Sequence, residues 1–201
     1  MEKIKFRGGA MLAPTPPVMV SCGDEKNANI ITVAWTGITN TMPPKTYISV
    51  RPSRHSYGII KERGEFVLNL TPSALVRAAD YCGTFTGAKA DKFEKCRLTK
   101  RFVEEVKAPL IDECPLSLCC RVTDVVPLGS HDMFLADIVA VYVSDELIDD
   151  KGKLHMAKAG LCAYAHGEYF ALGKRIGTFG FSAAKKKKKM PRKHGLSVKN
   201  M

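Results

Sequence analysis

Two long β-forming runs, Leu116–Val126 and Met133–Val143, constrain the fold of this chain more than any other feature of its sequence. Both runs are rich in valine and other apolar residues, and only a short turn sequence, Pro127-Leu-Gly-Ser130, lies near their junction. Two such runs around a short loop predict a long antiparallel hairpin. The remaining elements must be arranged around this hairpin.

Four shorter strands are predicted before it from their alternating or continuously apolar patterns. They are Val18–Cys22, Ile30–Thr36, Tyr47–Val50 and Glu65–Leu70. The first two are joined by a turn at Gly23–Asn27, which predicts a hairpin near the N-terminus. Three prolines in 11–17 forbid a regular helix before it, and Met42-Pro43-Pro44 breaks the chain before the third strand.

The predicted helices are short and lie between the strands. They cover Ser53–Lys61, with Ser53 as N-cap, Ala74–Cys82, and one helical turn at Asp91–Cys96. A loop is predicted over 83–90, and the chain after Asp149 is predicted to be irregular as far as Ser182. Because strands and helices do not alternate steadily, the pattern predicts a mostly β fold, an antiparallel barrel with short helical insertions.

The charge of the chain is concentrated at its C-terminal end. Of the formal net charge of +11, eight positive charges lie in 185–201, a stretch without acidic residues, so the remainder carries only +3. A run of like charges repels itself and cannot pack. The sequence therefore predicts one folded domain over 1–182 and a basic, disordered tail over 183–201.

Cysteine usage and hydropathy indicate the cellular compartment. The seven cysteines are odd in number and have no repeated spacing, which favours free thiols in a reducing compartment over a disulfide framework. The sequence begins with no leader pattern and contains no stretch of about 18 apolar residues. We therefore expect a cytoplasmic protein that does not span a membrane.

One segment concentrates the potential to bind an anion. Arg51, Ser53, Arg54, His55 and Ser56 crowd the start of a predicted helix, where free N–H groups and a partial positive charge favour a phosphate. The alternative is an ordinary helix N-cap with solvated arginines. The dinucleotide fingerprint, the P-loop, zinc-protease and nucleophile-elbow motifs are all missing from the sequence.

The order of several short motifs resembles the flavin reductase-like (flavoredoxin-type) family of FMN-binding split barrels. The motifs that carry the resemblance are Asn27–Gly37, Pro43-Pro44, Tyr47–Ser56, Phe66–Asn69, Gly87, Asp91–Phe93 and Gly129–His131. They span about residues 10 to 182. Two features depart from the family pattern: Ser130 replaces the usual acidic neighbour of His131, and the lysine-rich end is not part of it.

The resemblance implies a set of flavin-binding residues. Asn29, Thr32 and Trp35 are expected along the isoalloxazine ring, with backbone groups of Val33, Ala34, Trp35 and Thr36 at its polar edge. The FMN phosphate is expected at Arg51, Ser53, Ser56 and Lys92. His131 and Tyr164, from the same subunit or from a partner, are expected to close the site. No metal site is expected.

Each of these residues also has a purely structural interpretation. Trp35 fits a place in the core, because large aromatic residues are usually buried. Asn29 fits a hairpin turn, Lys92 a solvated surface lysine, and His131 a surface turn residue. The adjacent Cys119 and Cys120 fit buried structural thiols whose side chains point to opposite faces of a strand.

The resemblance implies a flavin-dependent oxidoreductase, in which a nicotinamide bound transiently reduces the flavin and a flavin, metal or partner protein accepts the electrons. An alternative in the same family is an electron carrier that receives electrons from a redox partner protein. A nucleic-acid-binding module that uses the basic tail belongs to another class, but the lysine run has no interleaved aromatic residues. A homodimer is expected, since the two long strands carry more apolar surface than a small barrel interior needs.

Overall fold

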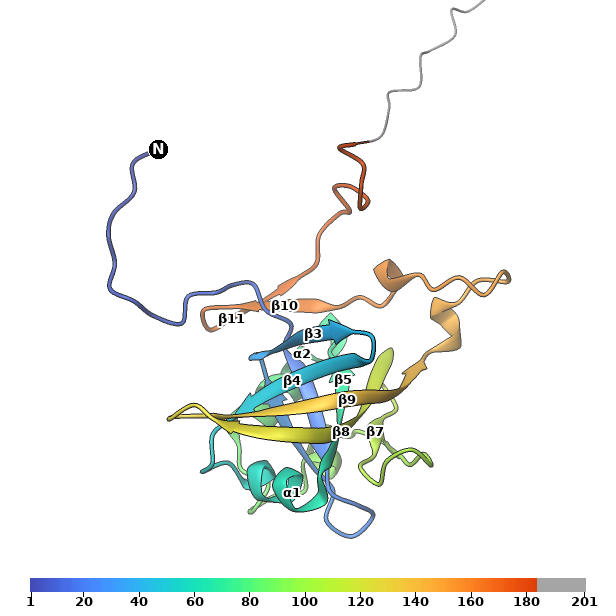
Figure 1. Cartoon of the computed structure of the whole chain (residues 1–201). Coiled ribbons are helices and arrows are strands. Elements are labelled where there is room, and N and C mark those ends of the chain that lie inside the picture. The colour runs from blue at the N-terminus through green and yellow to red at the C-terminus, as the bar shows by residue number, and fades with distance from the viewer. Residues whose placement is uncertain (184–201) are drawn as a thin grey trace, which may run out of the picture.

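The computed structural model describes residues 1–183 of the chain (Figure 1). Apart from its first residue, the predicted basic tail lies outside the described residues. Within 1–183, the longest α-helices have nine residues each, and none is long and apolar enough to cross a membrane.

The centre of the molecule is one seven-stranded antiparallel sheet with the strand order β2-β1-β5-β8-β9-β4-β3. Its strands are β1 (Val18–Cys22), β2 (Asn29–Val33), β3 (Thr36–Thr41), β4 (Pro44–Val50), β5 (Glu65–Leu70), β8 (Leu116–Pro127) and β9 (Asp132–Val143). The predicted long hairpin is β8–β9, and its two strands project beyond the barrel as the long pair seen in Figure 1. The predicted N-terminal hairpin is β1–β2.

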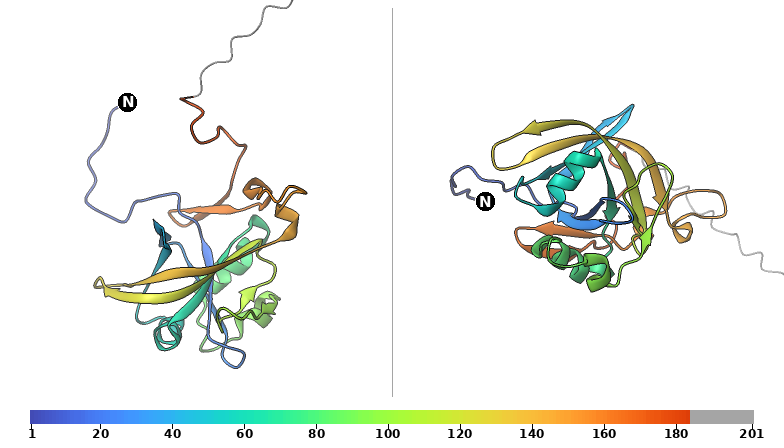
Figure 2. Two further views of the ribbon diagram at one scale, coloured as in Figure 1. Left: turned by 45° about the vertical axis from the view of Figure 1, so that its right-hand side comes forward. Right: turned by 90° about the horizontal axis from the view of Figure 1, so that it is seen from below.

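The two edge strands of this sheet, β2 and β3, are consecutive in the chain and are joined by Ala34 and Trp35. At this junction the backbone N–H of Ser49 in β4 donates a hydrogen bond of 2.9 Å to the carbonyl oxygen of Trp35. Because only two residues join the two edge strands, the sheet must curl back on itself, as the end-on view in Figure 2 shows. The bond from Ser49 continues the β3–β4 ladder, and no strand pairing joins β2 to β4 in residues 1–183, so the barrel is split on that side. The predicted antiparallel split barrel is confirmed.

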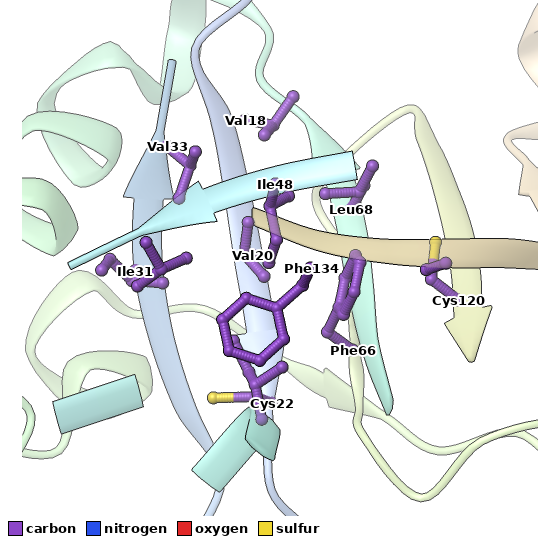
Figure 3. Packing of buried hydrophobic residues seen from close by; sticks show 13 residues of the cluster. Val18, Val20, Cys22, Ile31, Val33, Ile48, Phe66, Leu68, Cys120 and Phe134 are labelled. Atoms are coloured by element: carbon purple, nitrogen blue, oxygen red, sulfur yellow. The ribbon is translucent and has the colours of Figure 1, made fainter. Parts of the chain in front are cut away.

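Apolar side chains from alternating strand positions fill the barrel. Val18, Val20 and Cys22 of β1 point into it, and Figure 3 shows them around the rings of Phe66 and Phe134. Met19, the residue between two of them, packs on the opposite face against the helices. Because side chains alternate between faces, a strand that is covered on both sides is apolar at nearly every position. This explains the unbroken burial of β1.

The adjacent cysteines of β8 follow the same rule. Cys120 belongs to the barrel interior, whereas Cys119 packs in a separate cluster on the outside of the sheet. Both are fully buried, and burial raises the pKa of both thiols. The prediction that they are buried structural thiols on opposite faces is confirmed.

Three short α-helices accompany the barrel. They are α1 (His55–Arg63), α2 (Val76–Thr84) and α3 (Lys92–Cys96). Ile60 of α1 packs into the barrel core, while α2 and α3 pack on β1 and β2 from outside through Ala79, Cys82 and Phe93. Within the described residues, three 3₁₀ turns occur at η1 (Ser73–Leu75), η2 (Asp145–Leu147) and η3 (Met156–Lys158).

The predicted N-cap of the first helix is wrong by one residue. Arg54 is the N-cap of α1 and makes no side-chain capping bond, and the Arg54 N–H donates to the carbonyl oxygen of Arg51. The chain thus makes a tight turn at Arg51–Arg54 before the helix begins. Ser53 lies within this turn, where it cannot cap the helix.

Two strand predictions are also wrong in their extent. The strand predicted over Ile30–Thr36 ends at Val33, because the chain bends at Ala34 and Trp35 to close the barrel. The polar strand β3 that follows was not predicted, because four of its six residues are exposed at the sheet edge. β4 begins at Pro44, three residues before the predicted start at Tyr47.

The region after Asp149 is not irregular throughout. A hairpin forms from β10 (Cys162–Ala165) and β11 (Glu168–Ala171), and bridges from Thr15 to Tyr164 and from Pro72 to Leu161 attach it to the body. In Figure 1 it lies across the end of the barrel where β3 and α2 are labelled. The remaining strands, β6 (Lys100–Arg101) and β7 (Leu110–Ile111), form a small separate pair.

Candidate functional site

The split between β2 and β4 opens into a groove. It consists of two adjoining cavities, of about 330 Å³ and about 450 Å³, which share Ile31, Arg51 and Arg54 in their walls. The first cavity lies under the β10–β11 hairpin and is called here the hairpin end. The second lies at the start of α1 and is called the helix end. The shared residues make the two cavities one elongated groove.

The walls of the hairpin end come from the segment that closes the barrel and from side chains that lie far from it in the sequence. Thr32, Val33, Ala34 and Trp35 line it, together with His131 and Tyr164. The ring centroids of Trp35 and His131 are 4.5 Å apart, and Trp35 is 45% exposed. The alternative interpretation of Trp35 as a core residue is therefore wrong.

One of the predicted residues does not reach the groove. The side chain of Thr36 donates a hydrogen bond of 2.6 Å to the carbonyl oxygen of Tyr47, within the β3–β4 pair. Thr36 is missing from the described walls of both cavities. Thr32, by contrast, lines the hairpin end while its hydroxyl donates a bond of 2.5 Å to the carbonyl oxygen of Ala79 in α2.

His131 lies at the turn between β8 and β9, and the length of that hairpin carries it to the groove. Burial lowers the pKa of its imidazole, and the positive charges of Arg51 and Arg54 lower it further. Its Nδ1 lies 3.0 Å from the hydroxyl of Ser130, the residue that stands where the family commonly has an acid. The environment therefore favours the neutral imidazole.

The β10–β11 hairpin brings a second pair of rings to the groove. Tyr164 and Tyr169 meet edge to face at 5.2 Å, and the Tyr169 hydroxyl donates a bond of 3.4 Å to the carboxylate of Asp80 in α2. Burial, reinforced by Asp80, raises the pKa of Tyr169 to about 12. Sequence reasoning missed Tyr169 and Asp80, because no motif marks either residue.

The helix end brings together most of the residues predicted to hold a phosphate. Asn29, Arg51, Ser53, Ser56 and Lys92 all line it. Arg54 and His55 line it as well, and none of its described lining residues is acidic. The first turn of α1 contains no acidic residue and no side-chain cap, so its N–H groups face no competing protein anion. Arg51 and Arg54 are exposed, as the alternative of solvated arginines expects, but the side-chain cap that it also expects is missing at this helix start.

Asn29 and Ser56 form a buried pair at the base of the helix end. The Asn29 side-chain amide donates a hydrogen bond of 2.8 Å to the Ser56 hydroxyl, and both residues are buried. A Cβ atom on Gly87 would lie 2.1 Å from the Asn29 side-chain oxygen, so no other residue fits at position 87 without displacing Asn29. Asn29 lies within β2, which makes its interpretation as a turn residue wrong.

Lys92, the first residue of α3, is a buried cation. It is 3% exposed, and its Nζ donates hydrogen bonds of 2.7 Å and 2.8 Å to the carbonyl oxygens of Ile30 and Cys82. Burial is the main cause that lowers the pKa of its ammonium group. An ammonium group has three N–H donors, so one is left for a ligand in the cavity that Lys92 lines. Lys92 is therefore not a solvated surface lysine.

The two ends differ in a way that suits a flavin mononucleotide. The hairpin end offers aromatic walls and a barrel-closing backbone segment, which suit a planar ring system. The helix end offers three cations and a free helix start, which suit a phosphate. The residues present thus fit the FMN that the sequence resemblance implies.

Comparisons with known proteins agree with this geometry. The family model described as "Flavin reductase like domain" matches residues 10–173. The structure titled flavoredoxin of Desulfovibrio vulgaris (Miyazaki F) superposes with a TM-score of 0.84 at 29% identity, covering 91% of this chain and 100% of that one. A flavoredoxin from Methanosarcina acetivorans gives a TM-score of 0.83 at 28% identity, covering 92% of this chain and 100% of that one. An NADPH-flavin oxidoreductase of Streptomyces viridifaciens is 26% identical over 159 residues, which cover 75% of this chain and 79% of the relative.

Proposed function

This chain belongs to the flavin reductase-like domain family, and on that premise we propose that it binds FMN in the groove and transfers electrons from NADH or NADPH to a second flavin or another acceptor. The observation that carries the proposal is the distribution of aromatic and charged residues along the groove. The rings of Trp35 and the two tyrosines line the hairpin end, Lys92 lines the helix end, and Arg51 and Arg54 line both, an order along the groove that matches the ring and the phosphate of FMN.

In this proposal the helix end holds the phosphate. Arg51 and the spare Nζ donor of Lys92 neutralise a dianion that would otherwise be costly to desolvate. Ser53 and the N–H groups of the first turn of α1 supply further donors. Asn29 acts by holding the Ser56 hydroxyl in place through their hydrogen bond of 2.8 Å.

The hairpin end holds the ring system, which supplies the redox chemistry when it is bound, by accepting and passing on a hydride or single electrons. Trp35 and His131 form one wall, and Tyr164 and Tyr169 come from the β10–β11 hairpin. Because the surroundings of His131 disfavour its charged form, this wall adds little positive charge next to the ring. The protein residues therefore bind and orient the ring system, and no protein nucleophile is required.

A second function, electron carrier without nicotinamide activity, is favoured by one comparison. The two superposed structures with the higher identities, 29% and 28%, are both titled flavoredoxin. The sequence also contains no dinucleotide-binding fingerprint. In this alternative the same groove holds FMN, and a redox partner protein replaces the nicotinamide.

An absorbance spectrum followed by anaerobic mixing with NADH and NADPH tests these functions. A yellow protein whose visible bands bleach with a nicotinamide supports the reductase. A yellow protein that bleaches only with chemical or protein reductants supports the electron carrier. A colourless protein that fails to bind added FMN contradicts both, and would leave the nucleic-acid alternative, which depends on a tail outside the described residues.

We further propose that the protein is a homodimer. Val139 and Val141 of β9 are 39% and 52% exposed, so this strand leaves apolar surface in contact with water. A second copy that covered this face would remove that apolar surface from solvent. Light scattering at micromolar concentration should return twice the 22.1 kDa chain mass, and a monomer mass would contradict the proposal.

A further inference from the structure

Two cysteines bring their sulfur atoms together beside the helix end of the groove. Cys82 lies in α2 and Cys96 is the last residue of α3, and their Sγ atoms are 4.0 Å apart. Both thiols are free. A disulfide between them requires each sulfur to move by only about 1 Å, which rotation about side-chain bonds can supply. The adjacent Cys119 and Cys120, by contrast, lie on opposite faces of β8.

The two thiols differ in their access to solvent. Cys82 is fully buried and lines the helix end, whereas Cys96 is partly exposed. Burial raises the pKa of both thiols, to about 12 for Cys82, and the ammonium group of Lys92 opposes this rise at each of them. Few thiolates are therefore present at neutral pH. A reaction with a small oxidant should be slow and should begin at Cys96.

The chain between the two cysteines forms part of the proposed phosphate site. Residues 85–87 line the helix end, and Lys92 is the first residue of α3. The Lys92 Nζ donates a hydrogen bond of 2.8 Å to the carbonyl oxygen of Cys82, so α2 and α3 are already joined at this point. Cys82 and Cys96 are 14 positions apart. A covalent bond between them would close this segment into a loop and limit how far it can open.

We propose that Cys82 and Cys96 are a reversible modification site, which a small disulfide such as oxidised glutathione converts to an intramolecular disulfide, and that this bond slows the release of FMN. The Cys96 thiolate attacks one sulfur of the oxidant and releases the first small thiolate. The Cys82 thiolate then attacks the Cys96 sulfur and releases the second. Two protein thiols are oxidised, and the small disulfide is reduced to two thiols that take up the two protons. The effect on FMN rests on the proposed function, but the bond itself does not.

Glutathione buffers with an increasing oxidised fraction, applied to the FMN-loaded full chain at mildly alkaline pH, test the site. Trypsin separates Cys82, in the peptide Ala78–Lys89, from Cys96, in the dipeptide Cys96-Arg97. A species with the summed mass of the two peptides less two hydrogens therefore identifies the bond.

The number of titratable thiols gives a second measure. The native chain should lose two of its seven thiols, and Cys96→Ala should lose none. Cys162→Ala removes a buried thiol of β10 and is the matched control, which should lose two thiols as the native chain does. Retention of all seven thiols in the most oxidising buffer overturns the modification site. A glutathione adduct on Cys96 as the final product overturns it as well, because Cys82 then fails to displace the glutathione.

The consequences of the bond are measured on the oxidised and reduced forms of the same protein. The closed loop should raise the Tm by about 5–10 °C, with or without FMN. The rate of FMN release, followed by flavin fluorescence, should fall roughly two- to ten-fold on oxidation and stay constant in Cys96→Ala. A bond that forms without changing this rate overturns the effect on FMN. A chain that forms the bond but binds no FMN contradicts the proposed function, and with it the effect on FMN, while the modification site stands.

Discussion

The hairpin end and the helix end of the groove are built in opposite ways. The helix end takes most of its polar groups from one continuous segment, Arg51–Ser56, to which Asn29 and Lys92 are added. The hairpin end gathers single residues from distant parts of the chain, such as Trp35, His131 and Tyr164. Arg51 and Arg54 line both ends, Lys92 lines only the helix end, and the rings just named line only the hairpin end. Substitutions at the helix end should therefore discriminate between ligands by their phosphate, and substitutions at the hairpin end should not.

The largest effect is expected for Lys92→Met, which removes the buried cation but keeps an apolar chain of similar length. Loss of a charge-assisted hydrogen bond, at up to about 3 kcal/mol, should weaken FMN binding by on the order of a hundred-fold. Because Lys92 also bonds the carbonyl oxygens of Ile30 and Cys82, we expect a lower Tm as well. Titration of the apoprotein and thermal melting measure the two effects.

The pH dependence of FMN binding gives a second measure of the same lysine. Burial lowers the pKa of Lys92 below the ordinary lysine value of 10.5, so its charge is lost at a lower pH than that of a free lysine. FMN affinity should therefore fall as the pH rises toward that value, and Lys92→Met should not show this fall. Lys95→Met, at an exposed lysine of the same helix, is the control and should resemble the native chain. If FMN affinity depended on pH in the same way in Lys92→Met and Lys95→Met, the proposed role of Lys92 would be contradicted.

Arg51→Ala is expected to give a smaller and more selective effect. Arg51 is exposed and has no buried structural bond to lose. Its removal should therefore weaken FMN binding roughly ten- to a hundred-fold and leave riboflavin binding nearly unchanged. FMN binding should also become less sensitive to salt. Arg77→Ala, at an exposed arginine of α2 outside both described cavity walls, is the matched control. Equal losses for FMN and riboflavin would remove Arg51 from the phosphate site.

Trp35→Ala should affect both flavins alike, because Trp35 contacts the part of the groove proposed for the ring that they share. Aromatic pairs contribute about 0.5–1.5 kcal/mol beyond area burial, so we expect both dissociation constants to rise about two- to ten-fold. Trp35→Phe should recover much of the loss. If Trp35→Ala weakened FMN binding but not riboflavin binding, Trp35 would act on the phosphate, and the proposed division of roles between the two ends would be wrong.

The smallest effect is expected in the titration of His131. Removing the positive charge of Arg51 removes a repulsion on the imidazolium, so the pKa of His131 should rise toward the ordinary value of 6.5 in Arg51→Ala. NMR titration of the imidazole protons measures this shift, with Arg77→Ala again as the control. An unchanged pKa of His131 would show that the charge of Arg51 does not act on the imidazole.

Strands whose side chains alternate against a core were predicted well from the sequence. Val18–Cys22 and Glu65–Leu70 have the predicted bounds, and the long hairpin has its turn at the predicted place. The polar edge strand β3 and the four-residue strands β10 and β11 were missed. A polar edge strand and a four-residue strand show no periodic pattern of apolar residues. Such strands are stabilised by hydrogen bonds to a neighbouring strand and not by burial.

The sequence by itself determined the barrel strands β1, β5, β8 and β9, the cluster of basic and hydroxyl residues at the start of α1, and the order of motifs that identifies the family. These features depend on side-chain periodicity and on contacts between residues close in the chain, which a sequence displays directly. Only the tertiary structure decided that Lys92 is buried against Ile30 and Cys82, that Trp35 faces His131, and that Tyr169 reaches Asp80. These contacts join elements distant along the chain, and their geometry follows from how the curled sheet and its helices pack together, which no local pattern encodes.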